Sequence, residues 1–312
     1  MKDTLLLIDA NSLIYRAFHA LPPFTSPHGR PSGALYGLAS ILIKVFKERP
    51  FEYGAAAFDT PEPTVRESTY KAYKATRPPV PPALGPQIQE AHLLLDAFGI
   101  KTLEIPGWEA DDIVATLAHR FAKEKNLQII ALSGDLDLLQ IVRNNKIVVE
   151  MPKKGISNTV IYDEEAVEER FGIRPGQLTD FKGLTGDTSD NVPGVPGVGP
   201  KTASDLVKRY GTLEKLYKEA DEIGMPNEKL RQRLRLHKDQ ALLSKELVTL
   251  NSDLPLGVSL SDLAITRSLT HKEIVDYLSS WGFQSLAKRV AHAPGSSADE
   301  AVRDAAGENS KK

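Results

Sequence analysis

The sequence has no cysteine, no long apolar run and almost no net charge. Without cysteine, disulfides, thiolate zinc sites and cysteine nucleophiles are excluded. No run approaches the roughly 20 apolar residues that cross a bilayer, and the short apolar stretch before Asp9 predicts no signal peptide. The formal charge of −2 gives no indication of nucleic-acid binding. Any surface that binds nucleic acid must therefore be a local cluster of basic residues.

The remaining composition is typical of a folded chain of one large or two modest domains, with 312 residues, 41% hydrophobic and 26% charged. Segments of strand type alternate with segments of helical periodicity over the first two thirds. This alternation predicts an α/β fold with a mainly parallel sheet, followed by a helical region. The predicted strands are residues 5–8, 53–58, 127–132 and 146–150, and the later predicted helices are residues 163–171, 175–185, 200–210, 226–246 and 270–290.

Three of the predicted strands end in aspartate: Asp9, Asp59, and Asp135 with Asp137 just beyond it. The carboxyl ends of parallel strands meet at one edge of a sheet, where α/β proteins bind ligands. A single aspartate at such a place is as readily explained as a helix cap or turn residue. Three strand ends in one sheet weaken that explanation and predict an acidic site. Arg16, in the following helix, is a candidate phosphate clamp or the partner in a structural ion pair.

Two further acidic groups are Glu109, Asp111 and Asp112 at a predicted helix start, and Asp187 with Asp190 in a later turn. Acids in a first turn also complement the helix dipole, and acids in a turn can be merely solvated. Asp111 points away from its neighbours on a regular helix, so the three converge only if the opening turn lies against the sheet edge. Nine acids cannot stay ionised together without cations. Oxygen ligands alone select Mg²⁺ or Mn²⁺, and two such ions roughly 4 Å apart commonly hydrolyse phosphodiesters.

A glycine-rich turn lies at residues 194–203. It is not a Walker A loop, because Pro200 separates the glycine from Lys201. It fits a helix–hairpin–helix, in which a glycine-rich turn leads into a helix with proline at its first position. Backbone N–H groups at a helix N-terminus bind phosphate without reading sequence. A purely structural turn is the alternative.

A basic segment with interleaved tyrosines precedes these motifs. Lys71, Lys74 and Arg77 are spaced three residues apart, which predicts one shared helical face, and Tyr73 could stack on a base. An ordinary solvated face is the alternative. A second basic cluster, at residues 229–238, is explained by a surface helix without DNA.

Taken in order, these motifs resemble the 5′ nuclease domain of bacterial DNA polymerase I, in a family that includes phage 5′ exonucleases and archaeal and eukaryotic flap endonucleases. The match spans about residues 3 to 290. It is carried by Leu7-Ile8-Asp9 with Tyr15-Arg16-Ala17-Phe18-His19-Ala20, Phe58-Asp59, Tyr73-Lys74-Ala75-Thr76-Arg77-Pro78, Glu109-Ala110-Asp111-Asp112, Ser133-Gly134-Asp135-Leu136-Asp137, Gly186-Asp187-Thr188-Ser189-Asp190-Asn191 and Gly194 to Ala203.

The resemblance implies a mixed, mainly parallel sheet flanked by helices, with a helical arch at about 62–84 and a helix–hairpin–helix at about 184–210. It implies a nuclease core at 1–172 and a helical DNA-binding region at 173–291. Residues 292–312 have almost no large apolar groups, which predicts a flexible tail or the start of a linker. The implied activity is that of a Mg²⁺- or Mn²⁺-dependent 5′→3′ exonuclease and 5′-flap endonuclease in DNA replication and repair, with two metal ions.

The resemblance also implies roles for individual residues. The first metal site comprises Asp9, Asp59, Glu109 and Asp111, and the second is formed or supported by Asp112, Asp135, Asp137, Asp187 and Asp190. Lys74 and Arg77 engage the scissile phosphate, and with Asp111 and Asp135 they are the expected catalytic residues. The expected DNA contacts are Arg16 and Arg66 to phosphates, Tyr73 to a base, and Gly197, Gly199 and Lys201 of the hairpin, with a K⁺ ion among the hairpin carbonyls.

The sequence departs from the family pattern at Leu136, where many members have lysine, and at Val65, which replaces an aromatic residue before Arg66. No polymerase domain follows, so we expect a free-standing nuclease or part of a longer polymerase. We expect a cytoplasmic, nucleoid-associated monomer that acts on DNA with a 5′ flap, nick or 5′ end, without a membrane.

Two other functions are open to the same motifs. A non-catalytic module that binds DNA junctions would use the hairpin and the basic segment, but it gains nothing from nine acids that repel phosphate. A small-molecule phosphatase would use the acids, but it needs neither the hairpin nor the basic segment. The sequence therefore favours the two-metal nuclease.

Overall fold

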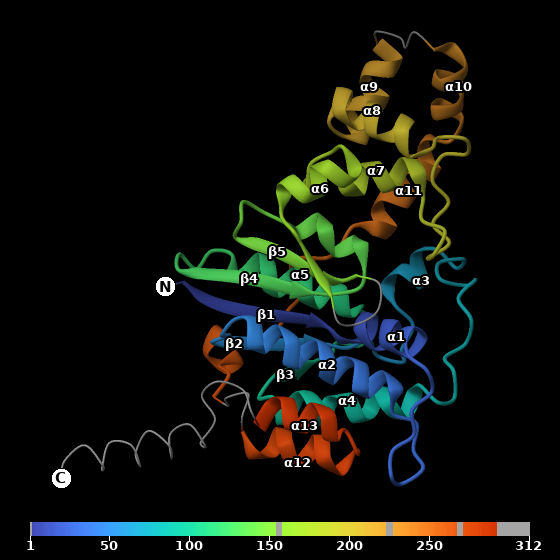
Figure 1. The fold of residues 1–312 in the computed structure, drawn as a ribbon. Coiled ribbons are helices and arrows are strands. Elements are labelled where there is room, and N and C mark those ends of the chain that lie inside the picture. Colours follow the sequence, from blue (N-terminus) through green and yellow to red (C-terminus); the bar gives the residue numbers. More distant parts are fainter. Residues whose placement is uncertain (1, 154–157, 223–226, 267–270, 292–312) are drawn as a thin grey trace, which may run out of the picture.

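The computed structural model describes residues 2–153, 158–222, 227–266 and 271–291 (Figure 1). Its centre is a six-stranded sheet of order β3-β2-β1-β4-β5-β6, in which β1 to β5 run parallel and β6 pairs antiparallel with β5. The expected mainly parallel sheet is confirmed. The strands are β1 (Asp3–Asp9), β2 (Tyr53–Ala57), β3 (Lys101–Leu103), β4 (Leu127–Leu132), β5 (Ile147–Pro152) and β6 (Thr159–Tyr162).

The sheet is buried on both faces because its central strands are apolar throughout. In β1, Leu5 and Leu7 join one hydrophobic cluster, whereas Leu6 and Ile8 join the other, as the alternation of side chains along a strand requires. One cluster includes helices α1 (Ala10–Ala20), α2 (Gly33–Glu48), α4 (Gly85–Ala97), α12 (Lys272–Ser280) and α13 (Gln284–Ala291), and the other includes α5 (Ala110–Phe121) and α7 (Leu178–Thr185).

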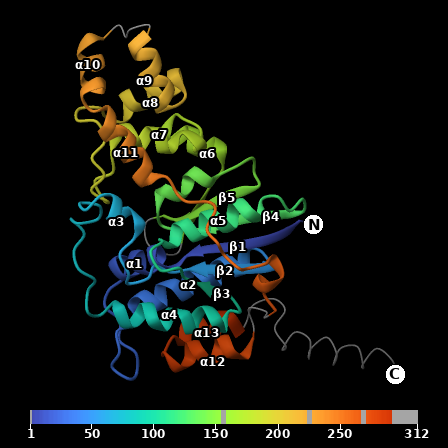
Figure 2. The same ribbon diagram turned by 180° about the vertical axis from the view of Figure 1, so that it is seen from behind.

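A helical region projects from one side of the core, at the top of Figure 1. After α11 the chain returns in an extended segment, residues 249–258, that runs past α5 toward the last two helices (Figure 2). The later helices α12 and α13 therefore pack on the core, although they follow the projecting region in sequence. The region contains α6 (Glu164–Phe171), α7, α8 (Pro200–Tyr210), α9 (Leu213–Glu222), α10 (Glu228–Leu236) and α11 (Lys238–Val248).

Several predicted elements differ in detail. The single helix expected at 270–290 is two helices, because Gly282 has a φ of +76° between them. The helix expected at 226–246 is also two, α10 and α11, with residue 226 outside the described residues. Strands β3 and β6 were missed because they are short. The tail expected at 292–312 lies outside the described residues. Among the described helices, none is long and apolar enough to cross a membrane.

Candidate active site

The first acidic position is the end of β1. Asp9 is the last residue of this strand and caps α1, accepting a hydrogen bond from the backbone N–H of Ser12 at 3.2 Å. Its other carboxylate oxygen accepts from the hydroxyl of Ser133, just past β4, at 2.7 Å. Asp9 is only 4% exposed. It is therefore fixed between the ends of two adjacent parallel strands.

Two further carboxylates follow β2 and β4. Asp59 Oδ1 accepts a hydrogen bond from the backbone N–H of Ala110 at 2.8 Å, which holds the start of α5 against the sheet edge. Asp135 caps the short helix η1 (Leu136–Ile141), accepting a backbone hydrogen bond at 2.9 Å. The parallel strands thus bring both acids to the same edge as Asp9, as the sequence predicted.

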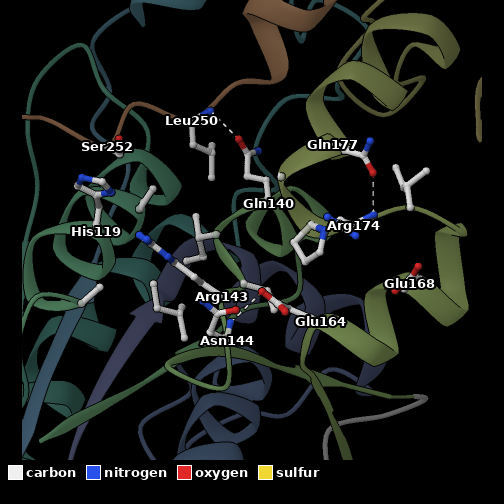
Figure 3. Close-up of a pocket in the computed structure, with 18 of the residues that line it drawn as sticks. His119, Gln140, Arg143, Asn144, Glu164, Glu168, Arg174, Gln177, Leu250 and Ser252 are labelled. Atoms are coloured by element: carbon white, nitrogen blue, oxygen red, sulfur yellow. Dashed lines mark hydrogen bonds between the residues drawn. The ribbon is translucent and has the colours of Figure 1, made fainter. Parts of the chain in front are cut away.

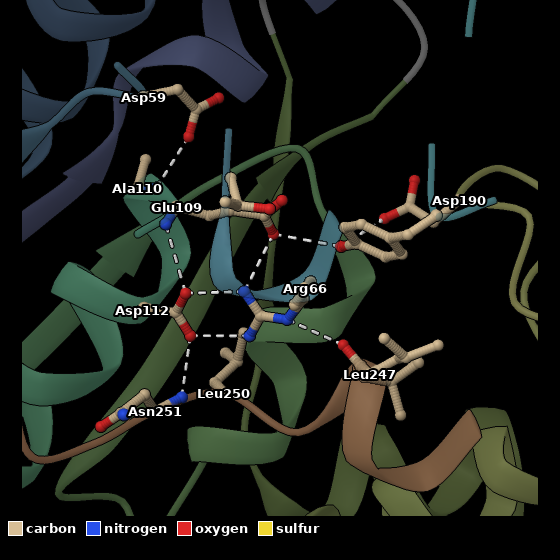
Figure 4. Close-up of polar contacts among 12 residues, drawn as sticks. Asp59, Arg66, Glu109, Ala110, Asp112, Asp190, Leu247, Leu250 and Asn251 are labelled. Atoms are coloured by element: carbon tan, nitrogen blue, oxygen red, sulfur yellow. Dashed lines mark hydrogen bonds and ion pairs between the residues drawn. The ribbon is translucent and has the colours of Figure 1, made fainter. Parts of the chain in front are cut away.

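The opening turn of α5 brings three acids together. Glu109 is the N-cap residue, and oxygens of Glu109, Asp111 and Asp112 lie within 4.8 Å of one another. The turn lies against the sheet edge through the hydrogen bond between Asp59 and Ala110 (Figure 4), which is the condition for their convergence. Among the described residues, Asp111 Oδ1 is buried without a hydrogen-bond partner. A buried carboxylate oxygen without a donor fits a cation ligand.

The acids act on one another electrostatically. The pKa of Asp9 is raised to about 7, mainly by burial and also by the nearby carboxyls of Asp59 and Asp135, although hydrogen bonds, chiefly from Ser133, partly offset the rise. Burial also raises the pKa of Asp59, Asp111 and Asp135. Strand ends distant in sequence therefore form one site that disfavours ionised carboxylates in the absence of cations. Hard divalent cations suit this oxygen-only donor set.

The turn after α7 adds the last two acids, Asp187 and Asp190, and α7 itself contributes Lys182, whose role the sequence did not predict. Lys182 Nζ pairs with Asp187 at 2.6 Å and also with Asp137, and only 12% of the lysine side chain is exposed. Burial raises the pKa of Asp187, but the contact with Lys182 outweighs burial and lowers it overall. A lysine in a last helical turn ordinarily complements the helix dipole, so the position of Lys182 in the sequence did not indicate a contact with the acids.

The basic segment is not the helix that its spacing predicted. Helix α3 covers only Val65–Thr69, and the turns that follow include Lys74 with a left-handed φ of 55°. Lys71, Lys74 and Arg77 therefore do not share a helical face, and that prediction is wrong. The backbone N–H of Lys74 donates to the carbonyl of Asp190 at 2.9 Å. Contact with the acidic turn stabilises this conformation, which a spacing rule cannot show.

Lys74 and Arg77 nevertheless reach the acids. Lys74 Nζ lies 2.5 Å from Glu109 Oε1, and Arg77 Nη2 lies 2.5 Å from Asp190 Oδ1. The Lys74 side chain is 20% exposed and that of Arg77 is 47% exposed. Both cations therefore lie between the acidic cluster and solvent.

Tyr73 and Arg66 are both buried, and Figure 4 shows Arg66 beside Glu109 and Asp112. The Tyr73 hydroxyl donates to Glu109 at 3.1 Å and lies 3.3 Å from an oxygen of Asp190. Arg66 forms ion pairs with Glu109 at 3.0 Å and with Asp112 at 2.6 Å. Neither side chain is free in this structure for the base stacking or phosphate contact that the resemblance implied, and these roles stay predictions.

Arg16 lies at the same edge of the sheet. Its guanidinium donates to the backbone carbonyl of Lys153 at 2.7 Å and lines a depression beside Gly134, the residue before Asp135. The partner that the structure gives it is a carbonyl oxygen, not a carboxylate. The position is compatible with the predicted phosphate contact.

The glycine-rich turn joins α7 to α8, as predicted. Gly197 has a φ of +74°, and a Cβ at this position would lie 2.8 Å from the guanidinium of Arg233. The same guanidinium donates to the Gly197 carbonyl at 3.1 Å. Gly199 caps α8, Pro200 is at its first position and Lys201 is exposed. This turn presents the N-terminus of α8 beside a cation from α10.

A cavity of about 1270 Å³ lies away from these acids (Figure 3). Its lining comes from the end of α5, the loop before β5, helix α6, residues 172–177 and the end of α8, and includes His119, Arg143, Glu164 and Lys208. None of the nine acids lines it in the described part of the chain. This cavity is therefore separate from the acidic cluster.

Fold and site together are those of a 5′ nuclease domain whose acidic site suits divalent cations. Residues 4–172 match the family model for the 5′-3′ exonuclease N-terminal resolvase-like domain, and residues 173–271 match that for the 5′-3′ exonuclease C-terminal SAM fold. The chain belongs to the 5′-3′ exonuclease family.

Similar proteins and structures agree with this assignment. The 5′-3′ exonuclease of Aquifex aeolicus is 37% identical over 287 residues, 92% of this chain and 95% of that protein. DNA polymerase I of Bacillus subtilis is 40% identical over 289 residues. The chain spans 32% of the length of that polymerase. T5 5′-exonuclease with bound zinc shares the fold, with a TM-score of 0.63 at 20% identity, covering 92% of this chain and 97% of that one. So does the catalytic core of Rad2 in complex with DNA, with a TM-score of 0.57 at 17% identity, covering 93% of this chain and 91% of that one.

Proposed function

We propose that this protein hydrolyses DNA phosphodiesters near 5′ ends, as a 5′→3′ exonuclease and 5′-flap endonuclease that uses two Mg²⁺ or Mn²⁺ ions. The observation that carries the proposal is the buried acidic cluster with raised pKa values, beside Lys74 and Arg77 at its solvent boundary. Repulsion among these acids is relieved by divalent cations, and the two basic residues attract phosphate.

The ligands are proposed from the family resemblance together with the acidic cluster. Asp9, Asp59, Glu109 and Asp111 hold one ion, and Asp135, Asp137, Asp187 and Asp190 hold or support the other. Asp112, also expected at the second site, is not among the proposed ligands. When bound, such ions activate water and stabilise charge on the phosphate and on the departing 3′ oxygen. Lys74 and Arg77 bind the scissile phosphate from the solvent side. Cleavage leaves a 5′ phosphate and a 3′ hydroxyl.

The hairpin supports a role in binding the duplex. The N-terminus of α8 and Lys201 offer a phosphate site, which would hold DNA without reading sequence. The K⁺ expected among the hairpin carbonyls would compete with Arg233, which already donates to the Gly197 carbonyl. We therefore assign the positive charge at this carbonyl to Arg233.

The biological setting is proposed from the relatives. Similarity to DNA polymerase I supports a role in removing primers and flaps during replication and repair, with a linked or separate polymerase as partner. We propose a monomer that acts at the nucleoid in the cytoplasm. Residues 1–172 would form the nuclease core with its arch at about 62–84, and residues 173–291 the DNA-binding region.

A labelled 5′-flap duplex tests the proposal. We expect cleavage with Mg²⁺ or Mn²⁺ and none with EDTA, because the acids cannot bind water and phosphate productively without cations. Gel analysis of the labelled products measures this. Binding of the flap without cleavage in any divalent metal would favour a junction-binding module. Hydrolysis of a phosphomonoester alone would favour a phosphatase.

The proposed phosphate contact of the hairpin predicts how DNA affinity depends on salt concentration. We expect log Kd for the flap duplex to change steeply with log salt, and Lys201→Ala to reduce the slope by about one, since one phosphate contact is lost. Fluorescence anisotropy in EDTA measures binding without cleavage. Lys123→Ala is the matched control, because Lys123 is an exposed lysine just past the end of α5 opposite the acids. Equal slopes for wild type and Lys201→Ala would contradict the assigned contact.

A further inference from the structure

One face of α5 binds the backbone of the extended segment 249–258. Asp112, Thr116 and Arg120 are spaced four residues apart, so they lie on the same side of the helix. Asp112 accepts from the N–H of Asn251 at 2.8 Å, and the Thr116 hydroxyl donates to the carbonyl of the same residue at 3.2 Å. Arg120 donates to carbonyls further along, including that of Leu254 at 3.2 Å. Asp112 is thus the first of three α5 side chains that hydrogen-bond to the backbone of this segment.

The carboxylate of Asp112 has no acceptor position left. Oδ1 accepts from Arg66 at 2.7 Å and from Asn251 at 2.8 Å, and Oδ2 accepts from Arg66 at 2.6 Å and from the N–H of Glu109 at 3.3 Å. A carboxylate offers about four acceptor positions. The side chain is fully buried. Its closeness to Asp111 therefore does not make it available to a cation.

All hydrogen-bond donors of the Arg66 side chain are also in use. Its five N–H groups make five hydrogen bonds: two to Asp112, one to Glu109 at 3.0 Å, and one each to the backbone carbonyls of Leu247 at 2.8 Å and Thr249 at 3.1 Å. Figure 4 shows this guanidinium enclosed between α5 and the end of α11. A guanidinium has five donors in a rigid fork, so none remains for a DNA phosphate.

We infer that Arg66 and Asp112 are positioning residues that join the end of α11 to the opening turn of α5, and that they are neither a phosphate contact nor a metal ligand. Through Glu109, the pair sets the position of a carboxylate of the proposed metal site. Because α11 belongs to the projecting helical region, the same pair couples that region to the acids. This inference rests on the proposed function, since it concerns the ligands of the divalent ions.

Three variants test the inference: Arg66→Gln, Asp112→Asn and the double variant. We expect each single variant to weaken Mn²⁺ binding, measured by isothermal titration calorimetry without DNA, by about tenfold, as loss of an outer-shell partner does. The double variant should be no worse than Arg66→Gln alone, because the Arg66–Asp112 ion pair is already lost in that single variant. The double variant replaces both members of the ion pair, so neither charge is left buried without the other. It therefore keeps the test valid if a single variant fails to fold. The salt slope of flap binding should equal that of wild type.

Thr116→Val is the matched control, because it removes a contact to the same extended segment and leaves the ion pair intact. We expect its Mn²⁺ affinity to equal that of wild type. A lower Mn²⁺ stoichiometry in Asp112→Asn alone would make Asp112 a ligand. A salt slope reduced by about one in Arg66→Gln would make Arg66 a phosphate contact. Unchanged Mn²⁺ affinity in all three variants overturns the inference, whereas wild type that neither binds Mn²⁺ nor cuts the flap overturns the proposed function instead.

Discussion

Replacing Asp59 by asparagine is expected to lower the single-turnover rate of flap cleavage by at least about 100-fold, because a metal ligand should matter more than the outer-shell partners that cost 10- to 100-fold. The fold should survive. Asparagine keeps an oxygen to accept the N–H of Ala110, which lies 2.8 Å from Asp59 Oδ1. Burial raises the pKa of Asp59, so its ionised form destabilises the metal-free protein, and Asp59→Asn should unfold at an equal or higher temperature at pH 8.

Asp163→Asn is the matched control for this variant. Asp163 also follows a strand and caps a helix, accepting from the N–H of Ala166 at 2.9 Å. Its strand, β6, is antiparallel, so Asp163 lies at the opposite edge of the sheet. Asparagine caps a helix as well as aspartate does, and the cutting rate should equal that of wild type. Full activity in Asp59→Asn would refute the metal assignment.

Lys74→Ala is expected to slow cleavage by about 10²- to 10³-fold, the usual effect of removing one group that stabilises transition-state charge. Flap affinity should change far less, since Lys74 is one of several phosphate contacts. Single-turnover kinetics at saturating enzyme measures the rate, and anisotropy in EDTA measures affinity. The ammonium lies 2.5 Å from Glu109 Oε1, so it is held beside the acids before any substrate binds.

Lys71→Ala separates this effect from loss of a basic charge. Lys71 is exposed and belongs to the same segment, but the structure gives it no contact with the acids among the described residues. We expect its cutting rate to equal that of wild type. A single-turnover rate for Lys74→Ala that matches wild type would remove Lys74 from the mechanism, and an equal slowing in both variants would indicate a general charge effect.

The strand-end acids could be predicted because their placement follows from a rule of topology. Asp9, Asp59 and Asp135 each follow a buried parallel strand, and parallel strands end at one edge. The glycine-rich turn was also predictable, since proline at the first helical position and glycine before it are local preferences. Family resemblance added expected roles, which local rules do not supply.

Other features could not be predicted, because they depend on contacts between distant segments. Lys74 adopts a left-handed turn against the acidic turn, and its segment is not the helix that its spacing indicated. Lys182 pairs with two acids, one of which is 45 residues away in sequence. Arg66 is buried by the end of α11, 181 residues further along, which no property of the basic segment indicates.

The amino-acid sequence alone determined the α/β class, the strands that carry acids and the edge at which these acids meet, because hydrophobic periodicity is a local property and continuous apolar strands that alternate with helices indicate a parallel sheet. Only the tertiary structure decided which of the adjacent acids Asp111 and Asp112 has an oxygen free for a cation. That choice depends on Arg66 and on the backbone of the extended segment, which contact one carboxylate and leave an oxygen of the other without a donor. Asp111 and Asp112 are adjacent residues of the same type. The hydrogen-bond donors around each of them come from segments that are distant in the sequence and pack against α5.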